Sequence, residues 1–364
     1  MFVLAIGASA QAKMWLEQAF PKETLKGPAE AKGAVIWSHG NNGNEWEDEA
    51  AIGPPLIASL LRDEGWDVFL FKRTFHEIGV PHPQTVELEA QVASFVAQGY
   101  RKIVLGGQSQ GAWISIMAAG ENANIYAVIA NAPATYGTSH PRYTMNASEL
   151  YGLLEDLRRG RIMVSYFRGD PYDPGGRGPR TEEILTRHDV PHLIVDQPDE
   201  FSGHSAGEGG LFYRRLAPCI LSLVGDGPMP ELKSCESHWG EAPSGEVPLP
   251  APLLFMSDPH GLAGRFIGKW WGAYSLGREV MLAVTNIEGT RVEAVYAFGP
   301  MPANLDKAGY QRRVGLADGD TLEFANKDMP TLRYRMNSDG TLQADWTATN
   351  GRSTYTTVLR KLPP

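Results

Sequence analysis

The chain has 364 residues, 43% of them hydrophobic and 21% charged, and a formal net charge of −9 at pH 7. This composition is typical of a globular protein, and the length suits one medium domain and one smaller domain. The acidic balance, without a local Lys/Arg cluster, disfavours nucleic acids and anionic membrane surfaces as partners. No apolar run approaches the roughly 20 residues that cross a bilayer, so we do not expect an integral membrane protein.

The N-terminal residues 1–12 read MFVLAIGASAQA, an apolar stretch that ends in Ala10-Gln11-Ala12. This pattern is typical of the end of a secretory signal and predicts a periplasmic or secreted protein. The alternative is a short buried strand, in which case the protein is cytoplasmic. The chain has two cysteines, Cys219 and Cys235. Export would permit a disulfide between them, and two unpaired thiols are the alternative.

Between residues 34 and 224, short apolar runs alternate with amphipathic segments. Strands are predicted at residues 34–37, 66–71, 102–105, 125–129, 162–167 and 193–195. Helices are predicted at residues 56–61, 86–96, 112–119, 146–157 and 211–224; the fourth opens on a capping box at Asn146 and Glu149, and the last contains Pro218. Apolar strands that alternate with helices predict an α/β fold with a mostly parallel sheet covered on both faces.

The C-terminal part of the sequence has a different pattern. Residues 226–259 are rich in proline and predict a stiff linker, where few contacts should cross between domains. From residue 260 to 364 the hydrophobic period becomes two, and turn dipeptides separate about eight segments. This predicts an antiparallel all-β barrel. The expected division is therefore 1–12 (signal remnant), 13–225 (α/β domain), 226–259 (linker) and 260–364 (β-domain).

Two G-x-S-x-G strings compete as sites for a nucleophilic serine: Gly107-Gln108-Ser109-Gln110-Gly111 and Gly203-His204-Ser205-Ala206-Gly207. A nucleophile elbow needs a strand directly before the serine and a helix directly after it, with glycines where a Cβ would clash. Ser109 has this context. Ser205 follows several loop residues and precedes a glycine-rich stretch, so we interpret it as an ordinary loop serine.

Four motifs together resemble the α/β-hydrolase superfamily over about residues 30 to 225. They are WSHGNNG after the first strand, GGQSQGAW at Ser109, DPYDP after a later strand and GHSAG after the last. The dienelactone-hydrolase-like esterase branch looks most similar. The β-domain, which begins with Gly268-Lys269-Trp270 and contains a late Arg360, resembles lipocalin-like (calycin-like) barrels, in which the arginine closes over the tryptophan.

The α/β-hydrolase resemblance implies the chain order Ser, Asp, His for a catalytic triad. Among the nine histidines, only His204 lies between the last strand and the closing helix, so it is the expected base. Asp170 is the expected acid because it ends a strand and has a proline four residues later, as in many relatives. Asp173 is the alternative acid.

An oxyanion hole needs two backbone N–H groups. We expect them from Gln110, the residue after the nucleophile, and from Asn41, in the loop after His39-Gly40. Asn41-Asn42-Gly43 is also compatible with a plain turn, and His39 is expected to be structural. No metal-ligand cluster or phosphate-binding loop is evident, and triad chemistry requires no cofactor.

These features predict a serine hydrolase that cleaves small or polymeric carboxylic esters through an acyl-enzyme. Two alternatives stay open. One is a serine amidase or peptidase, and the other is a non-enzymatic protein that keeps the hydrolase fold and binds a ligand. The sequence gives no indication of the oligomeric state.

Overall fold

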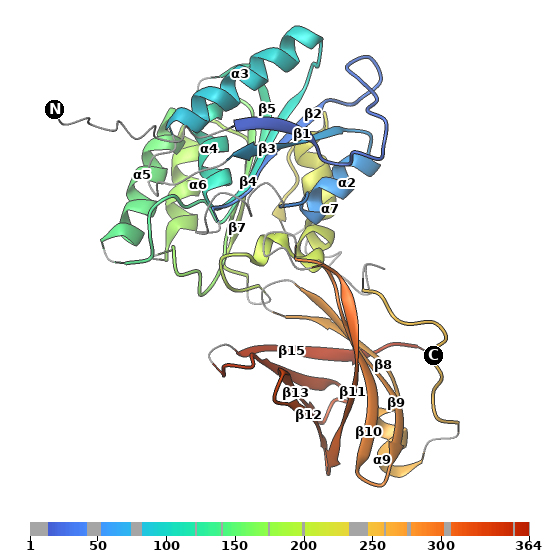
Figure 1. Cartoon of the computed structure of the whole chain (residues 1–364). Coiled ribbons are helices and arrows are strands. Elements are labelled where there is room, and N and C mark those ends of the chain that lie inside the picture. The colour runs from blue at the N-terminus through green and yellow to red at the C-terminus, as the bar shows by residue number, and fades with distance from the viewer. Residues whose placement is uncertain are drawn as a thin grey trace, which may run out of the picture.

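The computed structural model describes two units, an α/β unit and a C-terminal barrel (Figure 1). The described residues are 14–41, 52–73, 82–120, 122–139, 141–173, 175–198, 201–232, 247–257, 260–274, 278–301, 307–351 and 354–363. The predicted signal segment, residues 1–12, and Cys235 lie outside them. No helix of the described residues is both long and apolar enough to cross a membrane.

The α/β unit is built on a seven-stranded sheet of order β1-β3-β2-β4-β5-β6-β7. β1 pairs antiparallel with β3, and the other neighbours pair in parallel. The strands are β1 (Met14–Gln18), β2 (Ala34–Ser38), β3 (Asp67–Arg73), β4 (Ile103–Gln108), β5 (Ile125–Asn131), β6 (Arg161–Tyr166) and β7 (His192–Asp196). Because parallel strands end at the same edge, residues that follow β2, β4, β6 and β7 gather along one side of the sheet.

Helices cover both faces of this sheet (Figure 1). One face packs against α3 (His82–Gln98), α4 (Gln110–Ala119), α5 (Arg142–Asp156) and α6 (Arg177–Arg187). The other face packs against α2 (Leu56–Asp63) and α7 (Gly210–Val224), which follows the short 3₁₀ helix η1 (Ala206–Glu208). Central strands such as β2 and β4 are buried at every position, which explains their uninterrupted apolar runs.

The predicted fold class is confirmed: the unit has the α/β-hydrolase arrangement, and a separate antiparallel barrel follows it. In the described part of the α/β unit, one strand and one α-helix were not predicted. β1 is a half-exposed edge strand, and α6 contains Gly178 and Pro179 in its first turn and buries few apolar side chains. The predicted start of α5 is wrong, because the helix begins at Arg142 and Asn146 lies inside it.

The barrel is a closed meander of eight antiparallel strands in sequence order. They are β8 (Gly268–Ala273), β9 (Glu279–Glu288), β10 (Arg291–Phe298), β11 (Gly309–Asp318), β12 (Thr321–Asn326), β13 (Met329–Met336), β14 (Leu342–Thr347) and β15 (Thr354–Lys361). A short helix, α9 (Gly261–Phe266), precedes β8 and contributes Ala263 and Phe266 to the barrel core. The Trp270 indole Nε1–H donates to the Phe266 carbonyl over 2.7 Å, which fixes α9 against the barrel.

The cation that closes over the first tryptophan of the barrel differs from the predicted one. The Lys361 ammonium lies 5.2 Å from the centroid of the Trp270 ring. Arg360 is one residue out of register, because it pairs with Trp271. Since neighbouring residues of a strand point to opposite faces, Lys361 shares a face with Trp270 and Arg360 does not.

Side chains of the barrel contact the α/β unit at the junction between the two. Trp271, Met281 and Ala297, on the outer face of the barrel, belong to the same apolar cluster as α2 and α7. Glu279 accepts from the Trp271 indole over 3.2 Å and lies 3.5 Å from Arg214 of α7. The barrel therefore packs on the α/β unit through these side chains.

Cys219 is 1% exposed in α7 and is disulfide-bonded. Its expected partner, Cys235, lies outside the described residues, so the Cys219–Cys235 pairing stays a prediction.

Candidate active site

Ser109 occupies a sharp turn between β4 and α4. Its backbone has φ 55° and ψ −122°, a strained conformation for a residue with a side chain. The flanking glycines make the turn possible. A Cβ at Gly107 would lie 2.3 Å from the Gly111 carbonyl carbon, and a Cβ at Gly111 would lie 2.0 Å from the Ser38 oxygen. The spacing of the GGQSQG motif therefore has a steric cause, and the strain is located at the residue expected to be the nucleophile.

The loop after β2 reaches the same turn. β2 is the parallel neighbour of β4, with Ser38 opposite Gly107. A Cβ at Gly40 would lie 3.1 Å from the Ser109 Cβ, so the loop backbone passes directly beside the serine. Asn41 follows Gly40, and Gln110 begins α4, where backbone N–H groups have no partner inside the helix. Both expected oxyanion-hole residues thus belong to segments that adjoin Ser109.

Two buried groups hold this loop. The Arg73 guanidinium, at the end of β3 and 1% exposed, donates to the His39 carbonyl. The His39 ring Nδ1 hydrogen-bonds with the Gly40 oxygen at 2.7 Å. Burial, and secondly the positive charge of Arg73, hold the pKa of His39 well below its usual value. A neutral imidazole tied to its own loop fits the structural role expected for His39.

Asp170 and His204 meet at the ends of β6 and β7. His204 Nδ1 lies 2.9 Å from each carboxylate oxygen of Asp170. The Asp170 side chain is fully buried, and the Tyr172 backbone N–H donates to its Oδ1 over 2.8 Å. A carboxylate in this position requires the proton of a neutral imidazole to sit on Nδ1, which leaves Nε2 as an acceptor. Within the described residues, this buried Nε2 has no hydrogen-bond partner.

The His204 loop is fastened to the turn that carries Ser109. The Gln108 side-chain Nε2 donates to the His204 carbonyl over 3.1 Å. Asn131, at the end of β5, accepts from the Ser109 N–H at 2.9 Å and donates through its Nδ2 to the Gly207 carbonyl at 3.2 Å. These shared partners place Ser109 and the Asp170–His204 pair in one site at the carboxyl edge of the sheet.

Asp173, the alternative acid, and Ser205, the alternative nucleophile, lie in different surroundings from Asp170 and Ser109. Asp173 forms an ion pair with Arg177 at 2.9 Å, and both side chains are buried. Ser205 has φ −98° and precedes the 3₁₀ helix η1, so it lacks the strand-turn-helix geometry of Ser109. The small residues of its pseudo-motif have a packing reason, because a Cβ at Gly207 would lie 2.8 Å from the Asn131 side chain.

Tyr172 and Asn146 also shape the site, and the sequence did not point to either. The Tyr172 ring lies against His204 with centroids 4.3 Å apart. The Asn146 side chain accepts from the N–H groups of Thr135 and Tyr136 and donates to the Tyr172 carbonyl at 3.0 Å. It therefore ties the loop after β5 to the loop that carries Asp170. Asn146 is fully buried, and the sequence contains no signal for that burial.

No group of three or more His, Cys, Asp or Glu side chains that could hold a metal ion occurs among the described residues. No model of a known protein family matches the chain, and no curated protein sequence matches it either.

Several solved structures resemble the chain in backbone shape. An esterase of Pyrococcus furiosus is 16% identical, with a TM-score of 0.38, over 52% of this chain and 78% of that protein. A putative dienelactone hydrolase of Klebsiella pneumoniae is 14% identical, with a TM-score of 0.42, over 60% of this chain and 100% of the other. Esterase 2 of Thermogutta terrifontis is 14% identical, with a TM-score of 0.44, over 60% and 91% respectively. Because these sequence identities and TM-scores are low, the function of the chain has to be inferred from its own residues.

Proposed function

We propose that this protein is a serine hydrolase that cleaves carboxylic esters. The observation that carries the proposal is the strained Ser109 turn beside a buried Asp170–His204 pair whose outer nitrogen is free to accept a proton. Such a constellation is recognised by its geometry and roles on unrelated folds. An ester is the easiest substrate for such a site, because an alkoxide leaves more readily than the nitrogen anion of an amide.

In the proposed reaction, the Ser109 Oγ attacks the ester carbonyl carbon and His204 Nε2 takes its proton. Asp170 stabilises the imidazolium that forms. The carbonyl oxygen becomes an oxyanion and accepts hydrogen bonds from the backbone N–H groups of Gln110 and Asn41. Collapse of the tetrahedral species breaks the ester C–O bond, and His204 protonates the departing alcohol. Water then attacks the acyl-enzyme by the same route and releases the carboxylic acid.

The experiment compares Ser109→Ala with Ser205→Ala on p-nitrophenyl esters of graded acyl length, with p-nitroanilides alongside. Loss of a triad member typically lowers the rate by about 10⁴- to 10⁶-fold, so we expect Ser109→Ala to be inactive and Ser205→Ala to keep most activity. A fluorophosphonate probe should label wild type and Ser205→Ala only. An inactive, unlabelled Ser205→Ala would overturn the assignment. Faster anilide than ester cleavage would indicate an amidase, and no labelling of wild type would indicate a binding protein.

A further inference from the structure

Tyr172 lies beside the base of the candidate site, and the proposed reaction gives it no role. Its ring centroid is 4.3 Å from the centroid of the His204 imidazole, with 38° between the two planes. The tyrosine ring therefore lies over one face of the imidazole. Tyr172 is half-buried, whereas the Asp170 side chain is fully buried, so part of the tyrosine ring stays accessible.

The backbone of Tyr172 fixes the position of its ring. The Tyr172 N–H donates to Asp170 Oδ1 over 2.8 Å, and the Tyr172 carbonyl accepts from Asn146 Nδ2 over 3.0 Å. Neither hydrogen bond uses the tyrosine side chain. The ring can therefore be replaced without loss of the backbone contacts that hold the Asp170 carboxylate.

Asn146 also ties Tyr172 to the turn that carries the nucleophile. Its Oδ1 accepts from the Thr135 N–H at 3.0 Å. The residue before Thr135, Ala134, donates through its N–H to the Ser109 carbonyl over 3.3 Å. The tyrosine ring thus has a fixed position relative to Ser109, and it is in place before a substrate binds.

The leaving alcohol has to come close to this ring. In the proposed reaction, His204 Nε2 protonates the alcohol oxygen, which requires about 3 Å between these two atoms. Because Nε2 belongs to the imidazole on which the Tyr172 ring lies, a group attached to the alcohol oxygen can contact that ring. The acyl group stays on Ser109, and its oxygen is expected at the Gln110 and Asn41 N–H groups. Tyr172 therefore belongs to the alcohol side of the site.

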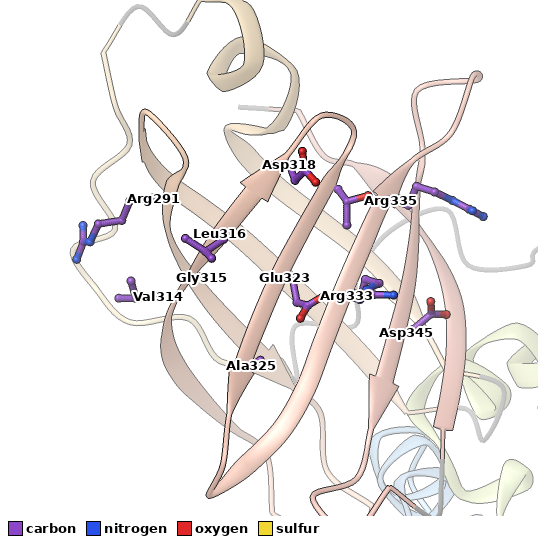
Figure 2. A pocket seen from close by; sticks show the side chains of 11 residues that line it. Arg291, Val314, Gly315, Leu316, Asp318, Glu323, Ala325, Arg333, Arg335 and Asp345 are labelled. Atoms are coloured by element: carbon purple, nitrogen blue, oxygen red, sulfur yellow. Dashed lines mark hydrogen bonds and ion pairs between the residues drawn. The ribbon is translucent and has the colours of Figure 1, made fainter.

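A groove on the outer face of the barrel is a competing place for an apolar group. Its volume is about 890 Å³, and Figure 2 shows Val314 and Leu316 on one side of it and Glu323 on the other. The Val314 and Leu316 side chains are 57% and 64% exposed, and Glu323 lies 2.6 Å from Arg333. The described lining of this groove contains no aromatic side chain and no residue of the triad.

We propose that Tyr172 determines which alcohol is released, and that the substrate is an ester whose alcohol carries an aryl group. The proposal names the substrate class of the proposed esterase and rests on that function. Aromatic rings attract each other in offset or edge-to-face contact at centroid distances of about 4.5–7 Å. An aryl group close to the leaving oxygen can take such a place against Tyr172, whereas a short alkyl alcohol leaves the ring uncovered.

The test compares two isomeric esters, benzyl acetate, with its ring on the alcohol, and methyl phenylacetate, with its ring on the acyl group. Wild type should have the higher kcat/KM for benzyl acetate. In Tyr172→Ala, the ratio of the two kcat/KM values should fall roughly 3- to 10-fold, the usual effect of losing an aromatic pair. Tyr172→Phe keeps the ring and should keep the ratio. A ring that only supported His204 would change both rates equally and leave the ratio unchanged.

Leu316→Ser changes the barrel groove and is the matched control, so its ratio should equal that of wild type. Loss of the preference in Leu316→Ser would place the aryl group on the barrel and overturn the proposal, as would a wild type that prefers methyl phenylacetate. If Tyr172→Ala fails to fold, Tyr172→Leu, which keeps an apolar side chain without the ring, decides in its place.

The two proposals fail in different ways. A wild type that hydrolyses neither ester and is not labelled by a fluorophosphonate would overturn the esterase function, and the role of Tyr172 with it. An active wild type whose ratio is unchanged in Tyr172→Ala would overturn the role of Tyr172 alone.

Discussion

Replacing the two candidate acids, Asp170 and Asp173, one at a time by asparagine should separate an effect on kcat from an effect on stability. The Asp170 carboxylate lies 2.9 Å from His204 Nδ1 and is fully buried. At this distance, an effective dielectric constant of about 20 gives about 4 to 6 kcal/mol of attraction for the imidazolium, equivalent to three to four orders of magnitude in rate. In Asp170→Asn, the amide can also donate to Nδ1, which moves the imidazole proton to Nε2 and blocks proton transfer from Ser109.

We therefore expect Asp170→Asn to lower kcat for p-nitrophenyl butyrate by about 10³- to 10⁴-fold with a nearly unchanged melting temperature. Asp173→Asn is the matched control. It breaks the buried ion pair with Arg177, which typically costs about 3–5 kcal/mol of stability, but it leaves His204 its partner. That variant should melt at a lower temperature and keep most of its kcat at 25 °C. The reasoning fails if folded Asp173→Asn is the inactive variant, or if Asp170→Asn stays within tenfold of wild type.

Two further predictions concern pH and the barrel. Burial raises the pKa of Glu208 to about 8. Between about pH 4.5 and 8, the folded state therefore binds more protons than the unfolded state. The free energy of unfolding should fall as the pH rises through that window, by at most about 1.4 kcal/mol per pH unit. Melting curves of Glu208→Gln should lose this component, and an unchanged pH profile would place the titration elsewhere. A chain that ends at Pro250 should still hydrolyse p-nitrophenyl acetate, because the site residues all precede Glu208, but it should melt several degrees lower because α7 loses Trp271 and Met281. A folded but inactive truncated chain would mean that the barrel completes the site.

Local patterns in the sequence were sufficient for the parallel strands β2 to β7 and for the strand-turn-helix at Ser109. Buried parallel strands require uninterrupted apolar runs, and the Ser109 turn tolerates no Cβ at Gly107 or Gly111. Both features therefore restrict which residues can occur, and they can be recognised in the sequence. The choice between Asp170 and Asp173 could not be made in the same way. Both stand in the same turn beside proline, and only the three-dimensional surroundings direct one carboxylate to His204 and the other to Arg177.

Asn146 shows why a local rule can fail. With Glu149 three residues later, it matches a capping box, whose energy is about 1 kcal/mol. In the structure, its side chain instead makes four hydrogen bonds to Thr135, Tyr136 and Tyr172 while the helix begins four residues earlier. Several hydrogen bonds to otherwise unpaired buried backbone groups outweigh one cap, because each buried group left without a partner costs about 1–3 kcal/mol. These partners lie in other loops, so the local sequence around Asn146 cannot show that their hydrogen bonds compete with a helix cap.

The packing between the two units could not be predicted for a related reason. Prolines mark where the chain is conformationally restricted, and they carry no information about which surfaces meet after the chain has turned back. Trp271 alternates with Trp270 along β8, and the pair serves two cores: Trp270 packs inside the barrel, and Trp271 packs against the α/β unit. Sequence alternation alone would assign Trp271 to solvent. A large apolar side chain at an outward position of a barrel strand is better explained by a covered surface, because exposing it would cost about 1.5–3 kcal/mol. The same argument identifies Met281 on β9 as an interface residue, and it implies that the two units melt together in the full chain.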